Sequence, residues 1–433
     1  LYSEKYKGKL ILVIDDTIGS VEKPIVKEGY DLIEDGFDLL GIKHSGKIVY
    51  KSDRLKIYYK YAEALIKKDK AYVCHCIQDV LRDNRANGRA CGCRILPKDI
   101  QILRWKEMFK MKEGQGVLRI KTDMLDPNPA FRDRVLFKIS DREHVRMGKK
   151  YRVWPTLEMS WAIDDHLLGI THIIRGNDLM IESDMERYIW KIFGWKAPEI
   201  IHTGYVKIKG ASIGKSKSRK EVESGKFIGW DDPRAWSIQS LIKRGIKAEA
   251  IREFVEEIGL NKQDISVPIE SLYSTNRKLI DSSSDRYSFI REPRKLKISG
   301  GPKWGNIEIP IHPDKTEKRI VKVGGIYISG EDLKKFSGKE VRLLHLYNID
   351  LGRKINVTSV DNKNIPKINW VSDFVECKIL MPDGVWVSGI CDSAVSGLKK
   401  REIIQFERFG FVSYNGKKKV KEKWVFEFWF AHR

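Results

Sequence analysis

Residues 164–176, DDHLLGITHIIRG, decide the fold of this chain. Ile170–Ile174 is a candidate for a buried strand of a parallel sheet, and the charged Arg175 follows it directly. A helix pattern over Glu182–Phe193 comes next, with acidic residues in its first turn and Gly194 just beyond its end. A strand that leads into a helix in this way indicates a doubly wound α/β sheet, in which ligands bind at the carboxyl ends of the strands.

The N-terminal part of the chain shows the same alternation of strand and helix. Lys9–Asp16 predicts a strand with a near-continuous apolar run, and helix patterns follow over Pro24–Leu40 and Arg54–Lys68. Asp15 lies at the carboxyl end of the first predicted strand, which makes it a candidate for ligand binding. A turn-capping aspartate is the alternative.

Two Cys-x-Cys motifs, Cys74 with Cys76 and Cys91 with Cys93, lie in an insertion between the two parts of the predicted sheet. Four thiolates are enough to close a tetrahedral zinc site, and the polar segment between the motifs has too few apolar residues to form its own core. Disulfides are the alternative, which the lack of a secretory pattern disfavours. We predict a structural zinc ion on the four cysteines, with His75 as a bystander.

Residues 214–218, GKSKS, alternate lysine with serine and are followed by Arg219 and Lys220. A mobile loop of this kind can close over nucleotide phosphates and compensate the charge of a leaving pyrophosphate. A solvated surface turn is the alternative for any Lys/Ser cluster in a basic protein. A nucleotide-binding function for this loop can therefore be inferred only together with the other features of the chain.

The C-terminal half changes from helix to strand patterns. The pattern is helical over about Asp231–Leu260, and Asp231-Asp232-Pro233 predicts the start of a helix. From about residue 295, short alternating or β-branched runs are punctuated by Gly, by Pro-Asp-Gly at 382–384 and by Asn415-Gly416. This pattern of short strands and turns predicts an all-β region of one or two barrels. The predicted strands cover Asn306–Ile311, Glu340–Tyr347, Val375–Leu380, Glu402–Phe406 and Lys423–Phe430.

The net charge is +22, from 81 Lys and Arg against 59 Asp and Glu in 433 residues. A chain of this length predicts about two to four domains. Cations spread over a folded chain favour a nucleic acid partner, and a Lys-rich, heat-adapted proteome is the alternative. The sequence has no apolar run of about 18 residues and no signal-peptide pattern, so we expect a cytoplasmic protein. A first residue other than Met, Leu1, suggests that the sequence lacks its start.

With these features together, the chain resembles the class I aminoacyl-tRNA synthetases of the glutamyl and glutaminyl group, and among them the archaeal glutamyl-tRNA synthetases. The resemblance covers nearly all 433 residues, and its motifs follow the family order: Ile14–Thr17, residues 164–176, Ser216–Ser218, Gly229–Arg234, Gln405–Phe411 and Phe428–Arg433. It implies a Rossmann-like catalytic domain and two-step ligation. Glutamate attacks the α-phosphate of ATP, with Mg²⁺ present, and the terminal ribose of tRNA then takes the acyl group.

The resemblance also implies roles for individual residues. Asp15 would bind the α-ammonium of glutamate. Arg175 would hold its side-chain carboxylate, which favours glutamate over glutamine; a structural ion pair is the alternative for this arginine. Lys217 matches the second lysine of the family's signature loop and would stabilise pyrophosphate, with further contacts to ATP from Lys215, Ser216 and Ser218.

The family organisation implies four regions. Residues 1–69 and 151–218 would form the catalytic domain, residues 70–150 an inserted zinc-containing subdomain at the tRNA acceptor end, and residues 219–290 a helical region along the tRNA stem. Residues 291–433 would form β-barrels that bind the anticodon, with Phe406, Arg408, Phe409, Lys417, Lys418 and Lys419 as the candidate contacts. Barrel core is the alternative for the phenylalanines, and a solvated hairpin tip beyond Asn415-Gly416 is the alternative for the lysines.

Several positions depart from the family pattern. Gly214 stands where the signature loop commonly has lysine, and Val13 stands where arginine is common. Leu157 and Met159 replace an aromatic residue in a segment that lines the amino-acid pocket, and Ile18-Gly19 replaces Asp-Pro. These departures concern details of the pocket and leave the resemblance in place.

The largest departure concerns a His-x-Gly-His element that contacts ATP in this family. No two of the nine histidines are three residues apart, and the first strand–helix unit of the fold is not found. We therefore expect a fragment of a longer product or one half of a split enzyme, with a degenerate paralogue as the third alternative. We expect that the chain alone forms no glutamyl-adenylate, which ATP–pyrophosphate exchange measures.

The partners implied by the resemblance are L-glutamate, ATP and tRNA-Glu, with tRNA-Gln as an open second substrate. A separate N-terminal half that carries the His-x-Gly-His element is a further expected partner. Two rival functions remain open at this point: a glutaminyl-tRNA synthetase, and a non-catalytic tRNA-binding or assembly protein. The first predicts a neutral residue at the position of Arg175, and the second predicts tRNA binding without amino-acid activation.

Overall fold

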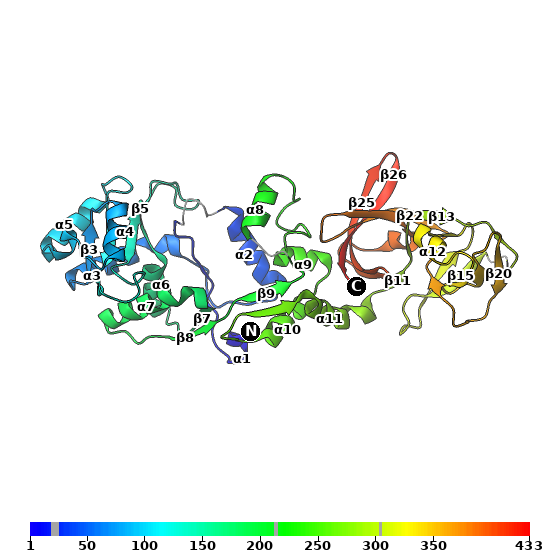
Figure 1. The fold of residues 1–433 in the computed structure, drawn as a ribbon, viewed down its shortest axis with the longest axis horizontal. Helices are drawn as coiled ribbons and strands as arrows, with labels where there is room; N and C mark the ends of the chain where they lie inside the picture. Colours follow the sequence, from blue (N-terminus) through cyan, green and yellow to red (C-terminus); the bar gives the residue numbers. More distant parts are fainter. Residues whose placement is uncertain (19–25, 212–214, 303–304) are drawn as a thin grey trace. The chain divides into compact units, whose positions relative to one another are not determined.

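The computed structural model describes residues 1–18, 26–211, 215–302 and 305–433, with residues 215–217 described by their backbone alone (Figure 1). The chain divides into two compact units. The first contains residues 1–37, 42–207 and 260–265, and the second contains residues 38–41, 208–259 and 266–433. No helix among the described residues is long and apolar enough to cross a membrane.

The first unit alternates short strands with amphipathic helices. Its helices are α1 (Tyr2–Lys5), α2 (Glu28–Leu39, which ends in the second unit), α3 (Leu55–Lys67), α4 (Gln78–Ala86), α5 (Lys98–Met108), α6 (Leu157–Leu167) and α7 (Met180–Phe193). Its strands are β1 (Val13–Ile14), β2 (Val49–Tyr50), β3 (Ala71–Cys74), β4 (Val117–Ile120), β5 (Val135–Ile139), β6 (Val153–Pro155), β7 (His172–Gly176) and β8 (Glu199–Thr203).

The parallel strands of this unit form two separate pairs. Strand β1 pairs with β2, with Val13 opposite Val49, and β7 pairs with β8, with Ile174 opposite Ile201. The strand predicted over Lys9–Asp16 is therefore wrong in its extent, because only two of its residues have a partner in β2. The expected α/β alternation is present, but among the described residues the parallel strands do not join into one sheet.

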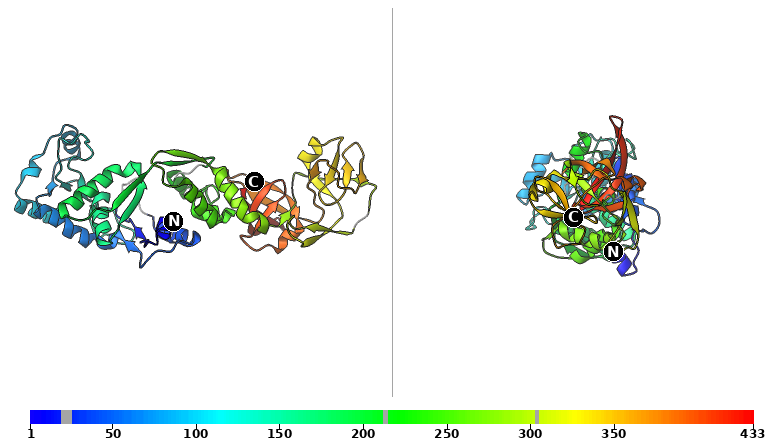
Figure 2. Two further views of the ribbon diagram at one scale, coloured as in Figure 1. Left: turned by 90° about the horizontal axis from the view of Figure 1, so that it is seen from below. Right: turned by 90° about the vertical axis from the view of Figure 1, so that its right-hand side faces the viewer.

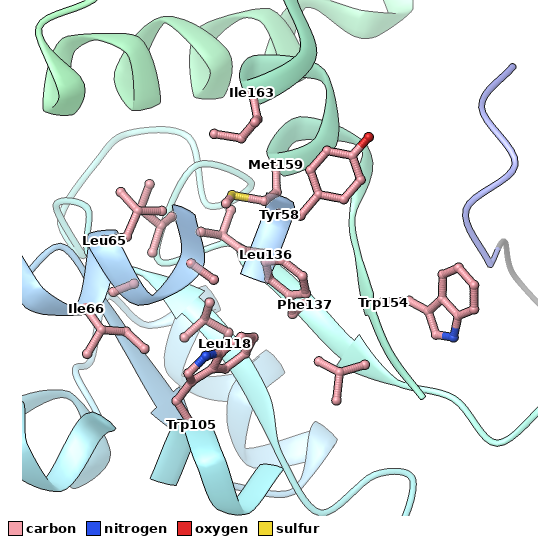
Figure 3. Packing of buried hydrophobic residues seen from close by; sticks show 14 of the residues in the cluster. Tyr58, Leu65, Ile66, Trp105, Leu118, Leu136, Phe137, Trp154, Met159 and Ile163 are labelled. Atoms are coloured by element: carbon pink, nitrogen blue, oxygen red, sulfur yellow. The ribbon is translucent and has the colours of Figure 1, made fainter. Parts of the chain in front are cut away.

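The main core of the first unit lies between helices and an antiparallel sheet. Strands β3, β4, β5 and β6 form that sheet, and α3, α5, α6 and α7 pack their apolar stripes against it. Figure 3 shows Leu65, Leu118, Phe137, Met159 and Ile163 meeting in this core. The segment inserted between the two parallel pairs thus shares one core with the chain on either side of it.

The extent of helix α7 agrees with its local sequence pattern. Its apolar stripe, which includes Ile189 and Trp190, is buried in the core. Its last turn ends at Gly194, which adopts the left-handed conformation with φ of 70°. The Trp195 amide donates to the Trp190 carbonyl across this glycine, which is the Schellman pattern that satisfies the last carbonyls of a helix. The helix predicted over Glu182–Phe193 is confirmed, two residues longer at its start.

The chain passes from the first unit to the second within β9 (Val206–Lys209), and a helical region follows. Its helices are α8 (Lys215–Glu223), α9 (Ile238–Arg244), α10 (Ala248–Ile258) and α11 (Ile269–Ile280), and β10 (Ile265–Pro268) precedes α11. The helix start predicted at Asp231 is wrong. Helix α9 begins after Ser237, whose hydroxyl accepts from the Ser240 amide, while the Asp232 carboxylate instead accepts from the amides of Ile228 and Arg234 in a turn.

The C-terminal part of this unit is all-β, as predicted. Seven strands form one sheet: β11 (Arg286–Tyr287), β24 (Ile403–Phe406), β25 (Gly410–Val420), β26 (Lys423–His432), β22 (Phe374–Leu380), β23 (Trp386–Asp392) and β12 (Phe289–Arg291), in that order. The two outer strands, β11 and β12, are one residue apart in the chain, so the sheet curls into a nearly closed barrel. Figure 2 shows this barrel in orange and red.

A second β region occupies the chain between β12 and β22. A five-stranded sheet in the order β14 (Ile298–Ser299), β20 (Ile355–Ser359), β19 (Asn348–Asp350), β18 (Glu340–Leu343) and β21 (Lys367–Ile368) surrounds its own apolar core. The remaining elements of this region are β13 (Pro293–Lys295), β15 (Asn306–Pro310), β16 (Lys318–Lys322), β17 (Tyr327–Ser329) and α12 (Gly330–Lys335). Of the one or two barrels that the sequence predicted, the structure therefore has two β bodies with separate cores.

The turn predicted at Asn415-Gly416 is wrong. These residues lie inside β25, at an irregularity in the β25–β26 register between Tyr414 and Gly416. The chain turns instead at Lys421 and Glu422, which both have positive φ, as a two-residue hairpin of the primed type requires.

Truncation of Leu136 tests the shared core of the first unit. Leu136 is fully buried, whereas Leu125 in the same unit is 77% exposed. We expect Leu136→Ala to lower the free energy of unfolding by about 2–5 kcal/mol, because it leaves a cavity. Leu125→Ala should change it by less than about 0.5 kcal/mol. Urea unfolding followed by tryptophan fluorescence measures both, and equal effects would contradict the assignment of this core.

Candidate functional site

A cavity of about 210 Å³ lies between β1 and β7 in the first unit. Its lining includes two charged residues that follow or end these strands, Asp15 and Arg175. The rest of the lining comes from Val13, Lys51, Trp161, Asp164, Asp165, Leu168 and Ile170. The two residues that the sequence analysis assigned to glutamate therefore line one cavity, at the carboxyl ends of parallel strands, where α/β sheets bind ligands.

Asp15 is held from three sides. The Lys51 ammonium lies 3.2 Å from its carboxylate, and the Trp161 indole N–H donates to the same oxygen at 2.8 Å. Thr17 donates its hydroxyl to the other oxygen at 3.1 Å. Lys51 is only 2% exposed and also donates to Ser160. A buried ammonium must be paired, so Lys51 and Asp15 fix one another at the wall of the cavity.

Arg175 is also committed to a partner within the chain. Its Nη1 donates to the Glu186 carboxylate at 2.9 Å and to the Ser183 hydroxyl at 3.2 Å. Its guanidinium stacks on the Trp161 ring at 4.9 Å. A guanidinium offers five N–H donors in a planar fork. The Glu186 contact therefore fixes the orientation of Arg175 and uses only part of its capacity to bind a carboxylate.

Two carboxyl groups near Arg175, those of Glu186 and Asp165, have a raised pKa. Burial raises the pKa of Glu186 to about 7 even though Arg175 acts in the opposite direction. Burial likewise raises the pKa of Asp165 to about 6, again against the nearby Arg175 and Lys51 charges. Perturbed carboxyls of this kind concentrate at functional sites, although structural ion pairs also produce them.

A second network fixes the strand end that carries Asp15. Asp16 is 1% exposed, and its carboxylate accepts from the Ser52 amide at 2.8 Å and from the Ser52 hydroxyl at 2.6 Å. His144 Nε2 lies 2.5 Å from the Asp16 carbonyl, and Arg146 lies 3.4 Å from its carboxylate. The backbone beside Asp15 is therefore held by the loop between β5 and β6.

Lys51, Trp161 and Glu186 were not identified from the sequence. Glu186 did carry a signal: it lies on the α7 stripe that also buries Ser183 and Ile189, and a carboxylate on an apolar stripe marks an unusual site. Trp161 and Lys51 had no such signal, because their role depends on contacts 146 and 36 residues away in the chain.

Residues 214–218, which match the family's signature loop, belong to the second unit. The backbone of Lys215–Ser218 forms the first turn of α8, so these residues are helical where a loop was predicted. Gly214 and the side chains of Lys215, Ser216 and Lys217 lie outside the described residues. Ser218 is buried, and its hydroxyl donates a hydrogen bond of 3.3 Å to the Ala235 carbonyl. This hydroxyl therefore already has a partner within the chain.

The four cysteines of the predicted zinc site come together at the end of β3. The sulfurs of Cys74, Cys76, Cys91 and Cys93 all lie within 4.8 Å of one another, and Cys74 and Cys91 are 3.6 Å apart. A zinc ion with Zn–S bonds of about 2.3 Å would place tetrahedral sulfurs about 3.8 Å apart. The donor set, its number and its spacing therefore fit zinc. His75 is not part of the group.

The anticodon candidates divide into buried and exposed residues. Phe406 is fully buried in the barrel core, and Phe409 is half-buried against it. The alternative of barrel core is therefore the correct one for Phe406. Arg408 donates two hydrogen bonds of 2.8 Å to the Asp332 carboxylate. Part of the hydrogen-bonding capacity of its guanidinium is therefore already used within the chain.

The three candidate lysines lie on β25 and are exposed. Lys417 lies over the Trp424 ring at 5.0 Å, and Trp424 is itself 52% exposed. Lys418 and Lys419 make long or exposed ion pairs, to Glu427 at 3.4 Å and to Glu422 at 2.9 Å. An exposed aromatic ring among lysines is a surface that suits nucleic acid.

Family models match almost the entire chain. Residues 1–282 match the catalytic domain of tRNA synthetases class I (E and Q). Residues 284–370 and 359–415 match two models of the anti-codon binding domain of the same group.

Individual relatives extend this match. A glutamate–tRNA ligase of Pyrococcus furiosus is 43% identical over 433 aligned residues, which cover 95% of this chain and 75% of that protein. One from Methanothermobacter marburgensis is 36% identical and covers 100% of this chain and 78% of that protein. A crystal structure of a glutamate tRNA ligase from Elizabethkingia meningosepticum in complex with its amino acid is 18% identical, with a TM-score of 0.45 over 64% of each chain.

The raised pKa of Glu186 predicts a pH-dependent stability. The group titrates near 4.5 when exposed and near 7 in the folded chain, so folding takes up a proton between these values and stability falls as pH rises through them. We expect the stability of the wild type relative to Glu186→Gln to fall by on the order of 2 kcal/mol from pH 4.5 to 7.5. Glu199→Gln, at an exposed side chain, is the control. A flat difference in urea unfolding across this range would contradict the assignment.

Proposed function

Because this chain belongs to the class I tRNA synthetases of the glutamyl and glutaminyl group, we propose that it serves as a glutamate–tRNA ligase. In this proposal, glutamate and ATP give glutamyl-adenylate and pyrophosphate, and the glutamyl group then passes to the 3′ end of tRNA-Glu. Support comes from relatives named glutamate–tRNA ligase at 36–43% identity over most of the chain. The observation that carries the choice of amino acid is the position of Arg175 at the cavity between β1 and β7.

The charges of the cavity suit glutamate. Arg175 has donors beyond the one used by Glu186, and these would hold the side-chain carboxylate of the substrate in a bidentate contact. Asp15 would accept from the α-ammonium. The Lys51 ammonium beside Asp15 limits the negative charge at this wall, which lowers the repulsion of the substrate's carboxylates.

Glutamine fits this arrangement less well. Its amide turns either an oxygen without a charge or an N–H donor toward Arg175, and a donor against a guanidinium leaves both groups unpaired. This argument opposes the second candidate function, a glutaminyl-tRNA synthetase. It does not address which tRNA is used, and tRNA-Gln remains a candidate second substrate of the proposed enzyme.

The phosphate chemistry is assigned to α8. We propose that Lys217 stabilises the leaving pyrophosphate and that Lys215 and Ser216 contact ATP, which binds with Mg²⁺. The family match and the position of these residues in the first turn of a helix support this, because a helix N-terminus favours anions. Ser218 is a weaker candidate, since its buried hydroxyl already bonds Ala235. The transfer itself needs mainly positioning and charge compensation.

The proposed tRNA surface extends along the chain. Residues 70–150 would contact the acceptor end, residues 219–290 the stem, and residues 291–433 the anticodon. The two anti-codon binding matches and the exposed lysines of β25 support the last of these. We further propose that a separate polypeptide supplies the His-x-Gly-His element, and that the complex acts in the cytoplasm.

Glutamate binding provides a direct test. We expect saturating L-glutamate to raise the melting temperature of the chain through preferential binding to the folded state, and glutamine to do so much less. Arg175→Gln/Glu186→Gln removes the binding group and its partner together, so no buried charge is left unpaired, and should abolish the shift. Arg187→Gln, at an exposed arginine of α7, should preserve it. An equal response to glutamine would favour the alternative function.

Metal analysis tests the zinc proposal. We expect about one zinc ion per purified chain, bound by Cys74, Cys76, Cys91 and Cys93. Cys91→Ser should remove the metal and unfold the segment around it, because a structural zinc supplies folding energy. The matched control is Cys377→Ser in the barrel core, since Cys377 and Cys391 are also buried cysteines but lie outside the cluster. Full zinc content in Cys91→Ser would contradict this ligand set.

A further inference from the structure

Glutamate carries three charged groups, and the roles proposed for Arg175 and Asp15 give partners to only two of them. Arg175 is assigned to the side-chain carboxylate and Asp15 to the α-ammonium, and both line the cavity between β1 and β7. The α-carboxylate has no partner in this assignment. A carboxylate that leaves water without gaining a hydrogen-bond donor is strongly disfavoured, so the cavity should offer a further donor close to Asp15.

Lys51 lies next to Asp15 at the carboxyl ends of two paired strands. Strand β2 pairs in parallel with β1, with Tyr50 opposite Ile14, so the residues that follow these two, Lys51 and Asp15, also lie side by side. The Lys51 ammonium is 3.2 Å from the Asp15 carboxylate. Because the ammonium and the α-carboxylate of an amino acid share one carbon atom, their two partners must be neighbours, as Asp15 and Lys51 are.

Among the described residues, the Lys51 ammonium has fewer acceptors than donors. An ammonium has three N–H donors, and two acceptors lie within hydrogen-bond distance, Asp15 at 3.2 Å and the Ser160 hydroxyl at 3.1 Å. The Ser160 hydroxyl donates in turn to the Leu157 carbonyl, so it accepts from Lys51. The Lys51 side chain is 3% exposed and lines the cavity, so a ligand reaches it through that cavity.

Trp161 connects this position with Arg175. Its indole N–H donates to Asp15 at 2.8 Å. The Lys51 ammonium lies 5.3 Å from the centre of the Trp161 ring, and the Arg175 guanidinium lies 4.9 Å from it. A glutamate with its α-carbon at Asp15 and Lys51 can therefore extend along the indole toward Arg175.

A structural ion pair is the alternative role for Lys51. Thr17 and Trp161 already donate to the two oxygens of the Asp15 carboxylate, so this carboxylate is held in place without the ammonium. Burial of an ammonium costs free energy even when the ammonium is paired. Stabilisation of the strand end therefore does not by itself account for a buried charge at this position.

The charge of Lys51 also acts on the far side of the cavity. Burial raises the pKa of Asp165 to about 6 and that of Glu186 to about 7, and Lys51 opposes both shifts together with Arg175. Its field therefore extends from Asp15 to the carboxyl groups around Arg175. Positive charge at a cavity with little access to water favours an anionic ligand.

We infer that Lys51 is a substrate-binding residue that holds the α-carboxylate of glutamate, while Asp15 beside it holds the α-ammonium. The ion pair and the α-group of the amino acid then meet as complementary charges, ammonium on carboxylate and carboxylate on ammonium. This inference rests on the proposed function, because it names a further contact to the same amino acid. It makes Lys51 a residue that distinguishes an α-amino acid from an amine of the same length.

Ligands that each lack one group of glutamate test this role. 4-Aminobutanoate lacks the α-carboxylate, and glutarate lacks the ammonium. Dissociation constants come from the dependence of the melting temperature of the 433-residue chain on ligand concentration. We expect the chain to bind glutamate about ten-fold or more tightly than 4-aminobutanoate, which is the effect of one charge-assisted hydrogen bond.

Lys51→Gln should weaken the binding of glutamate and of glutarate by about ten-fold or more. It should leave the binding of 4-aminobutanoate unchanged or make it tighter, because Asp15 then carries an uncompensated negative charge. A purely structural role would weaken all three ligands together. Lys56→Gln, at an exposed lysine of α3, is the matched control and should alter none of the three constants.

Three outcomes would overturn the role of Lys51 alone. They are equal affinity of the unsubstituted chain for glutamate and 4-aminobutanoate, equal losses for all three ligands in Lys51→Gln, and tighter binding of glutamate by Lys51→Gln. The last would show that Lys51 competes with the substrate for Asp15. Absence of any response to glutamate would instead contradict the proposed function, and this role of Lys51 with it.

Circular dichroism checks that Lys51→Gln is folded. If it is not, Lys51→Gln/Asp15→Asn replaces both members of the pair, so that neither is left as an unpaired charge. The comparison is then between glutarate and butanoate, which differ by one carboxylate and both lack the ammonium. The unsubstituted chain should prefer glutarate by about ten-fold or more, and the double variant should bind the two alike. The same preference in both proteins would overturn the inference.

Discussion

Helix α6 joins the parts of the first unit through the side chains of Asp164 and Trp161. Asp164 accepts from Arg54 at 2.7 Å and from the Tyr58 hydroxyl at 2.6 Å, which fixes α6 to the segment that follows β2. One turn earlier, Trp161 reaches Asp15 at the end of β1 and forms a platform for Arg175 at the end of β7. Because the two parallel pairs share no ladder among the described residues, this helix supplies the link that keeps Asp15 and Arg175 in one cavity.

The elements that local pattern predicted best are those whose signals lie within one turn or one motif. Helix α7 follows its apolar stripe and ends at a glycine with positive φ, and the cysteine cluster follows from two Cys-x-Cys motifs whose geometry a single metal would demand. The family motifs placed Asp15 and Arg175 at strand ends, and these residues do line a common cavity.

Features that depend on contacts between residues far apart in the chain could not be predicted from local sequence patterns. The strand over Lys9–Asp16 shrinks to two residues because strand length is set by the neighbour available for pairing. Asn415-Gly416 has the composition of a hairpin turn, yet β26 extends beyond it and converts it into an irregularity within a longer ladder. Arg175 was predicted to bind a carboxylate, with a structural ion pair as the alternative. Its contact with Glu186, which orients it, follows only from the packing of α7 against β7.

The order of strands in the barrel has a consequence for synthesis of the protein. Strand β26, Lys423–His432, lies between β25 and β22 and pairs with both. The sheet therefore cannot close until β26 has left the ribosome, although β11 and β12 were made more than 130 residues earlier. During that interval the apolar faces of β22 and β23 have no complete core to enter, and a nascent chain at this stage presents unpaired strands to chaperones and to other chains.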